Sequence, residues 1–340
     1  FFCCCQDQAV PFGMRHESMS RTLTVVALAF IASIADIRAS ECAADDRPST
    51  SGKGISQELA RWMGTLETPG RINSKLSSYE FPVLGAGILA NDDIAENETL
   101  VEIPMLAVMS QRTAGESAIK EVILGNKKFD YFASLVMHVL YEDNLGPESK
   151  FADYLSTLPR DVDLPLTWAP QELGALNGTK LGTYIALQRN STYSDYVTFF
   201  EPIFKENPDL FPAESFNFER YLWALSIVMS RSFFFNVGGG ERVPVLVPVA
   251  DVFNHDNNAA TEVSVTESGK MVSIRTSKPV AKGDQVFVNM GPKSNFMLLP
   301  NHGFAVHGNA LDKTMLHGLE LEVVDPFRAI RAGMLAQLGV

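Results

Sequence analysis

The chain has 340 residues, of which 46% are hydrophobic, and its 28 Lys and Arg against 40 Asp and Glu leave a net charge of −12. This apolar content excludes a chain that is disordered throughout, and the length predicts one large domain or two at roughly 100–200 residues each. The acidic balance argues against general nucleic-acid binding, which needs a basic surface. It favours a basic partner, such as a Lys-rich protein segment.

All four cysteines lie near the start of the chain, at Cys3, Cys4, Cys5 and Cys42. The main body therefore has no cysteine for a disulfide framework, a Cys-ligated zinc site or a Cys nucleophile. The histidines are few and scattered along the chain. We therefore expect no metal centre.

Residues 1–43 are predicted to be a leader. Arg21 precedes an apolar run of 13 residues, 23–35, which is shorter than the about 20 residues that span a bilayer. Small residues follow near Ala39 and Ala43, which completes the pattern of a signal peptide. We therefore expect entry into the secretory pathway or, in an organism with complex plastids, a bipartite plastid address.

The sequence does not begin with Met, and Met14 and Met19 are candidate start residues. If the leader is not translated, we expect a cytoplasmic protein. The polar stretch 44–55 contains Gly and Ser and is predicted to be a linker. Ordered structure is expected from about residue 56.

The ordered part begins with a helix and a β-rich stretch. Trp62 and Met63 belong to a short run of apolar residues at helical spacing, which predicts the helix. Strands are expected at 87–90 and 99–104, and the polar turn between them predicts that they pair as a hairpin.

A helical insert separates this stretch from a second set of strands. Apolar residues recur at helical spacing from about 125 to 230. After the three glycines 238–240, strands are expected again at 245–249, 262–266, 271–277 and 286–290. A further helical segment is expected around 325–337. This order of strands, helical insert and strands predicts an α+β fold.

Three short motifs depart from ordinary element composition, and the first is Leu84-Gly85-Ala86-Gly87. Its two glycines run directly into a predicted strand, where a ligand can approach the backbone closely. No third glycine and no helix follow, so the motif is not a dinucleotide-binding fingerprint. A β-turn is the alternative explanation.

The second motif is Asp251-Val-Phe-Asn254-His255, at the end of an apolar strand. The amide of Asn254 offers both a donor and an acceptor, which suits an adenine edge or an amino-acid head group. A capped turn with a hydrogen-bonded histidine is the alternative. The third motif spans residues 288–304 and includes the segments 291–295 (Gly-Pro-Lys-Ser-Asn) and 302–304 (His-Gly-Phe). By itself it is a strand–turn–helix connection.

In this order and spacing the three motifs resemble the SET-domain protein methyltransferases, and most closely the Rubisco large-subunit methyltransferase type. The segments around Trp62 and over 151–159 also resemble this branch. The resemblance implies a SET fold over 56–305, made of small β-sheets with a C-terminal pseudoknot and interrupted by a helical insert at about 125–230. It further implies that 306–340 is the beginning of a C-terminal substrate-binding helical domain, truncated in this chain.

The resemblance also implies an activity. It predicts an S-adenosyl-L-methionine-dependent protein-lysine N-methyltransferase that acts on a non-histone protein. The Cys-rich segment that follows many histone-directed SET domains is not found in the sequence. The expected partner is a protein with an exposed lysine, or histidine, and we expect no nucleic acid, no transmembrane span and a monomer.

Residue by residue, the resemblance assigns cofactor contacts to three motifs and to the end of the insert: Leu84, Gly85, Ala86, Gly87, Arg231, Asn254, His255, His302, Gly303 and Phe304. The Arg231 guanidinium would meet the carboxylate of the cofactor, and Asp251 would line the substrate side. The three phenylalanines 233–235 offer walls for an apolar channel, with core packing as the alternative.

Position 290 departs from the family pattern. The family places a tyrosine there whose phenol contacts the target amine, and this chain has Met290, which we assign to the substrate side. A thioether cannot donate a hydrogen bond, so no catalytic residue is assigned. The role of the family's phenol could be filled instead by His302, Tyr184 or Tyr221. The alternatives are a catalytically weak SET-like protein that binds cofactor, a protein partner or both, and a protein-histidine methyltransferase.

Overall fold

The computed structural model describes residues 57–66, 68–82, 84–236, 241–266 and 268–312. The predicted leader, linker and C-terminal domain lie outside the described residues, except for the first few residues after 305. Within the described part, no helix combines the length and apolar character needed to cross a membrane.

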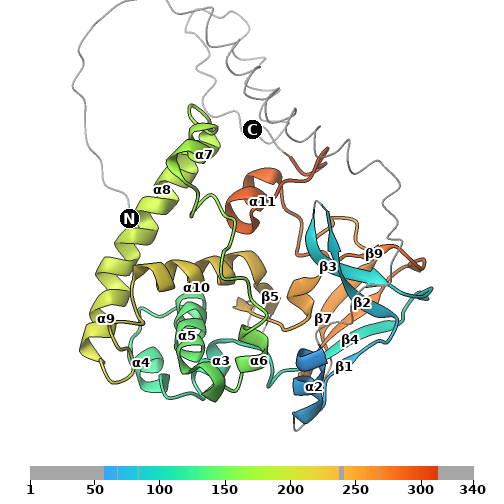
Figure 1. The fold of residues 1–340 in the computed structure, drawn as a ribbon, viewed down its shortest axis with the longest axis horizontal. Coiled ribbons are helices and arrows are strands. Elements are labelled where there is room, and N and C mark those ends of the chain that lie inside the picture. Colours follow the sequence, from blue (N-terminus) through green and yellow to red (C-terminus); the bar gives the residue numbers. More distant parts are fainter. Residues whose placement is uncertain (1–56, 67, 83, 237–240, 267, 313–340) are drawn as a thin grey trace, which may run out of the picture. The chain divides into compact units, whose positions relative to one another are not determined.

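The strands of the described residues form three small antiparallel sheets (Figure 1). The largest has the order β1-β4-β8-β7, and the second has the order β2-β3-β9. Their bounds are Arg71–Ile72 (β1), Leu76–Phe81 (β2), Gly85–Ala90 (β3), Thr99–Pro104 (β4), Thr261–Val265 (β7), Met271–Thr276 (β8) and Gln285–Val286 (β9). The central strands β4 and β8 are mostly buried, whereas the edge strand β7 alternates buried or half-buried residues with exposed ones, as expected for a strand with one face toward solvent.

The predicted hairpin between 87–90 and 99–104 is wrong. The strand at 87–90 is part of β3, which pairs with β2 and β9, and 99–104 is β4, which pairs with β1 and β8. The turn between them is bound by a later segment of the chain, because Ile94 forms an isolated bridge with Val280. Glu98 anchors the same turn, because its carboxylate accepts a bond from Lys75 Nζ at 2.9 Å. The polar turn therefore carries the chain from one sheet to another.

The helices gather beside the sheets and include the predicted insert (Figure 1). Their bounds are Gln57–Thr65 (α2), Gln111–Ala114 (α3), Lys120–Gly125 (α4), Tyr131–Leu145 (α5), Ala152–Leu155 (α6), Pro170–Gly174 (α7), Lys180–Asp195 (α8), Glu201–Glu206 (α9) and Phe218–Arg231 (α10). Asp130 and Asn217 cap α5 and α10, each accepting a bond from a backbone N–H of the first turn. The insert packs an aromatic core that includes Phe200, Phe204 and Tyr221.

The entry helix is tied to the insert. Met63 is buried in α2, and the indole N–H of Trp62 donates to the carbonyl of Lys150 at 3.2 Å. Lys150 directly precedes the segment 151–159. The two segments that the family resemblance singled out thus meet in the fold.

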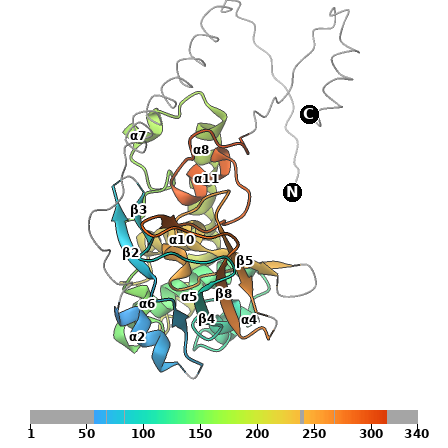
Figure 2. The same cartoon turned by 90° about the vertical axis from the view of Figure 1, so that its right-hand side faces the viewer.

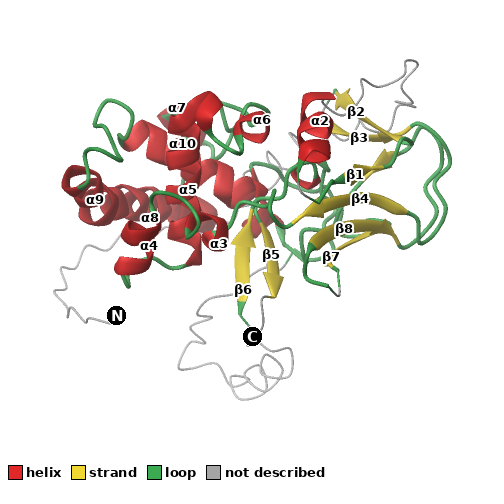
Figure 3. Ribbon diagram, turned by 90° about the horizontal axis from the view of Figure 1, so that it is seen from below, coloured by secondary structure: helices red, strands yellow, loops and turns green. Residues whose placement is uncertain are grey.

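A third, two-stranded sheet follows the insert and consists of β5 (Phe233–Asn236) and β6 (Arg242–Val245). It lies between the helices and the other strands (Figure 3). Phe233 is buried and stacks on Phe235, while Phe234 is 43% exposed. This alternation is that of a strand with one packed face, so Phe233 and Phe235 serve core packing.

The last elements are a short 3₁₀ turn, Ala250–Val252, and α11 (Asn295–His302). α11 lies near α8 in both views (Figures 1 and 2), and the Tyr184 and Phe296 rings are 5.5 Å apart. The strand expected at 286–290 is shorter than predicted, because regular pairing with β3 ends at Val286. The chain then crosses to the segment that carries the second motif.

Candidate active site

The second and third motifs lie side by side. His255 forms a parallel bridge with Val288. The backbone N–H of Val288 donates to the Asn254 carbonyl at 2.9 Å, and the N–H of Asp256 donates to the Val288 carbonyl at 3.1 Å. Residues 254–256 and 288–290 are far apart in sequence, and these bonds fix their register.

The His255 ring is held from both nitrogens. The backbone N–H of Met290 donates to Nδ1 at 3.1 Å, so Nδ1 is unprotonated, and Nε2 lies 3.2 Å from Oδ1 of Asn257. Nε2–H therefore donates to Asn257. Burial lowers the pKa of His255, which agrees with a neutral ring. His255 thus acts here as a fixed connector between the two segments.

The first motif meets the second at Gly87. The Asn254 side-chain amide donates to the Ala86 carbonyl at 3.2 Å. A Cβ on Gly87 would lie 2.7 Å from Asn254 Nδ2 and 2.6 Å from Gln285 Nε2. Gly85 begins β3 with a φ of +69°, a conformation that favours glycine. Both glycines are therefore required by the geometry, and Leu84 before them is 49% exposed.

Gln285 is a site residue that the sequence did not indicate. Its side chain extends from β9 toward Gly87, and within the described residues its buried Nε2 has no hydrogen-bond partner. Buried donors are nearly always paired. An acceptor brought to this point would therefore be stabilised. A glutamine in a short edge strand carries no sequence signal of such a role.

Arg231 and Asp251 form one cluster with a residue from the insert. Arg231 ends α10, donates from Nη1 to the Asp251 carbonyl at 3.1 Å and lies 3.5 Å from its carboxylate Oδ2. The Tyr154 hydroxyl donates to the same Oδ2 at 2.8 Å. Burial raises the pKa of Asp251, and the Arg231 charge and the Tyr154 bond oppose that shift. The Arg231 side chain is 27% exposed and that of Asp251 is 2% exposed, so Arg231 alone has an open side toward which an anion can bind.

The end of the third motif completes the arrangement. His302 donates from Nδ1 to the Ser230 carbonyl at 3.0 Å, next to Arg231, and burial lowers its pKa to about 4. The ring of Phe304 lies 6.2 Å from that of His255 and 6.1 Å from that of His302. Gly303 has a φ of +81° and ends α11, where a Cβ would come within 2.1 Å of the Asp163 carbonyl.

Met290 is partly buried against the core. Its N–H is used by His255, and its carbonyl accepts a 2.6 Å bond from Lys293 Nζ. Burial lowers the pKa of Lys293. Of the tyrosines considered as substitutes, Tyr221 lies in the aromatic core of the insert, where burial raises its pKa well above the ordinary value, and Tyr184 packs on α11.

The structure therefore brings the predicted residues together from separate elements: Gly85, Ala86 and Gly87 from β3, Arg231 from α10, Asn254, His255 and Met290 from the paired segments, and His302, Gly303 and Phe304 from the end of α11. Their roles toward a ligand stay predictions. The residues that sequence reasoning missed are Gln285, which had no signal, and Tyr154, which lay within a recognised segment but had no assigned role.

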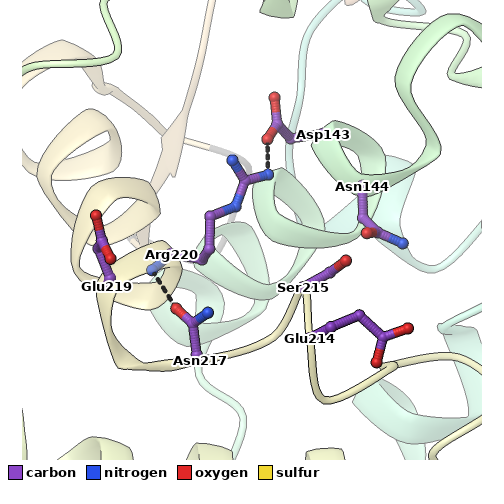
Figure 4. Close-up of a pocket in the computed structure, with 7 residues that line it drawn as sticks. All are labelled: Asp143, Asn144, Glu214, Ser215, Asn217, Glu219 and Arg220. Carbon is purple, nitrogen blue, oxygen red and sulfur yellow. Dashed lines mark hydrogen bonds and ion pairs between the residues drawn. The ribbon is translucent and has the colours of Figure 1, made fainter.

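A separate pocket lies away from this site, among the described residues (Figure 4). It has a volume of about 440 Å³ between α5, α10 and the loop before α10, and includes Asp143, Asn144, Glu214 and Arg220. Arg220 pairs with Asp143, and its backbone N–H donates to Asn217. None of its lining residues belongs to the three motifs. A smaller pocket of about 220 Å³ includes Asp256 and Gln285 and adjoins the site.

Known proteins are similar to this chain in sequence. The N-lysine methyltransferase setd6 of Danio rerio is 32% identical over 237 residues, which are 64% of this chain and 50% of that protein. The actin-histidine N-methyltransferase of Danio rerio is 27% identical, covering 75% of this chain and 43% of its own length. The chloroplastic fructose-bisphosphate aldolase-lysine N-methyltransferase of Arabidopsis thaliana is 28% identical, covering 82% and 58%. The chain thus spans about half the length of the curated relatives it matches.

A solved structure shares the fold. The SET domain of LSMT bound to lysine and AdoHcy superimposes with a TM-score of 0.66 at 22% identity, covering 80% of this chain and 61% of that one. The family model for the SET domain matches residues 85–291, more than half of the chain. That match begins at the first motif and ends at the start of the third, with the helical insert between them. The chain belongs to the SET-domain family.

Proposed function

We propose that this protein is an S-adenosyl-L-methionine-dependent protein-lysine N-methyltransferase that acts on a non-histone protein. Membership of the SET-domain family supports the reaction class. Two relatives named as lysine methyltransferases support lysine as the target residue. One of them is named for its action on fructose-bisphosphate aldolase, which supports a non-histone target. The observation that carries the proposal is the convergence of three separated motifs around Gly87, Asn254 and His255.

The residues present fit the proposed cofactor. Gly85 and Gly87 leave the β3 backbone bare, the Asn254 amide lies directly over it, and Gln285 Nε2 is a buried donor without a partner in the described part. Arg231 offers a partly exposed guanidinium suited to a carboxylate. When bound, S-adenosyl-L-methionine supplies a methyl group on a sulfonium. Binding and positioning of the reactants are the work of the protein's own residues.

The chain's contribution is positioning. Methyl transfer to an amine is an in-line displacement, in which holding the reactants in line supplies much of the rate. His255 fixes the backbone at Met290, because its Nδ1 holds the Met290 N–H. The target amine must be neutral to react, and an apolar channel favours the neutral form. Met290 and the adjoining apolar core provide such surroundings.

Two alternative functions are also considered, and the first follows from Met290. Its thioether cannot donate to a target amine, which favours a catalytically weak protein that binds cofactor, a protein partner or both. A histidine target is the other alternative, supported by similarity to the actin-histidine N-methyltransferase of Danio rerio. Lysine and histidine side chains give different methylated products, so identifying the methylated amino acid distinguishes these two targets.

Calorimetry with S-adenosyl-homocysteine followed by transfer of a labelled methyl group to proteins of a lysate tests the proposal. We expect binding that Asn254→Ala weakens by about 1–3 kcal/mol, the cost of leaving buried polar groups unpaired, and methyl-lysine in hydrolysed products. Methylhistidine would establish the histidine alternative, and binding without transfer would establish the weakly catalytic one. Absence of binding by the folded protein would refute the cofactor assignment.

Two further parts of the chain are proposed by similarity. The name of the Arabidopsis thaliana relative places that protein in the chloroplast, which supports the plastid address among the destinations considered for the leader. Residues 306–340 are proposed to begin a substrate-binding helical domain. Fusing residues 1–55 to a fluorescent protein and observing where it accumulates tests the first of these proposals.

A further inference from the structure

We propose that Tyr154, from the helical insert, is a positioning residue that holds Asp251 and, through it, aims Arg231 at the cofactor site. The inference rests on the proposed function for the identity of the ligand. It assigns the insert a direct part in the binding site. The tether itself consists of three side chains from three separate segments: α6, α10 and the 3₁₀ turn over residues 250–252.

The geometry of the tether is specific. The Tyr154 hydroxyl donates to Asp251 Oδ2 at 2.8 Å, and Arg231 Nη1 lies 3.5 Å from the same oxygen and 3.1 Å from the Asp251 carbonyl oxygen. Tyr154 is fully buried, and the Asp251 carboxylate is 2% exposed. A buried carboxylate needs both a counter-charge and hydrogen bonds. Tyr154 and Arg231 together provide them.

Only Arg231 in this cluster has an open side. Its side chain is 27% exposed, and among the described residues it donates to the Asp251 carbonyl and pairs with the Asp251 carboxylate. Arginine has many rotamers, so fixing its guanidinium before a ligand arrives reduces the entropy lost on binding. The neighbouring carbonyl of Ser230 accepts a bond from His302, so the end of α10 is held on both sides.

A purely structural role for Tyr154 makes a different prediction. If the phenol only fills space in the core, removing its hydroxyl should lower stability and leave Arg231 where it is. If it holds Asp251, removal should also change the titration of Asp251. Among the described residues, the charged or titratable groups that act on the Asp251 carboxyl are Tyr154 and Arg231. The Tyr154 bond lowers the pKa of Asp251, so removing it raises that pKa.

The first experiment measures binding of S-adenosyl-homocysteine by calorimetry across the acid range. In Tyr154→Phe we expect about a 3- to 10-fold loss of affinity, the size of one hydrogen bond to a charged group acting indirectly. We also expect the acid loss of binding to begin at a higher pH, because protonated Asp251 no longer holds Arg231. Tyr141→Phe is the matched control, since Tyr141 is another buried tyrosine of the insert, packed on Phe211.

The second experiment does not depend on the cofactor. Phenylglyoxal modifies accessible arginines, and peptide mass spectrometry reports the rate at Arg231. We expect modification at least about 3-fold faster in Tyr154→Phe than in the wild type or in Tyr141→Phe, because a charge-assisted tether is lost. If Tyr154→Phe melts below the assay temperature, Asp251→Asn tests the same tether from its other end.

The outcomes separate the two hypotheses. Equal labelling of Arg231 in wild type, Tyr154→Phe and Asp251→Asn would overturn the positioning role, whatever the cofactor does. Faster labelling combined with no S-adenosyl-homocysteine binding by wild type would keep the tether and refute the proposed function. Faster labelling with an unshifted acid limb of binding would also overturn the positioning role, because Arg231 would then not serve the cofactor.

Discussion

Substituting Gly87 by alanine tests whether the first and second motifs form one site. A Cβ at Gly87 would lie 2.6 Å from Gln285 Nε2 and 2.7 Å from Asn254 Nδ2, whereas ordinary contacts begin at 3.4 Å. The two amides must therefore withdraw by 0.8 and 0.7 Å. Moving Asn254 away by that amount lengthens its 3.2 Å bond to the Ala86 carbonyl beyond hydrogen-bonding distance.

The expected cost follows from that displacement. Losing the Asn254 bond and leaving its amide misplaced costs about 1–3 kcal/mol, which corresponds to roughly 5- to 150-fold weaker binding at 1.4 kcal/mol per tenfold. Calorimetry with S-adenosyl-homocysteine measures it, with urea unfolding to confirm that the variant folds. Gly64→Ala is the control, because a Cβ there meets nothing within 4 Å and helix α2 favours alanine. Wild-type affinity in folded Gly87→Ala would refute the assembled site.

Three further predictions concern chemistry, acid stability and the leader. Met290→Tyr should raise single-turnover methyl transfer by roughly 30- to 1000-fold, because a transition-state hydrogen bond contributes about 2–4 kcal/mol; equal rates on the same acceptor would show that position 290 does not limit catalysis. Bonds from Lys75 and from the Ala95 N–H lower the pKa of Glu98 from 4.5 to about 2. A lowered carboxyl pKa stabilises the fold above the unfolded value, and that stability is lost as the pH falls from about 4.5 to about 2. Urea midpoints of Glu98→Gln should therefore fall less steeply over this range, and parallel slopes in both proteins would contradict the assignment. A chain that begins at Gly54 should keep the thermal transition of one that begins at Met19, since the omitted residues are predicted to be leader and linker. Calorimetric melting well below that transition would show that the leader is part of the folded structure.

Local sequence patterns located most of the elements. Helical spacing identified the insert, and Gly291 with Ser294 and Asn295 marked the turn into α11, although the Ser294 side chain makes no capping bond there. Pairing was not predictable in the same way. The polar turn before β4 looks like a hairpin loop, but Ile94 and Glu98 bind partners that are far away in sequence. Turn residues indicate where a strand ends, but they do not indicate which other strand it pairs with.

Composition, the order of strands, insert and strands, and the three motifs could all be predicted from the amino-acid sequence, because each depends on residues that are neighbours along the chain. Three contacts became visible only in the folded chain: Asn254 touches Gly87, Gln285 reaches the same point, and Tyr154 holds Asp251. These contacts join residues separated by about a hundred or more positions. They depend on how sheets and insert pack, where burial and hydrogen bonding are satisfied jointly by the whole fold.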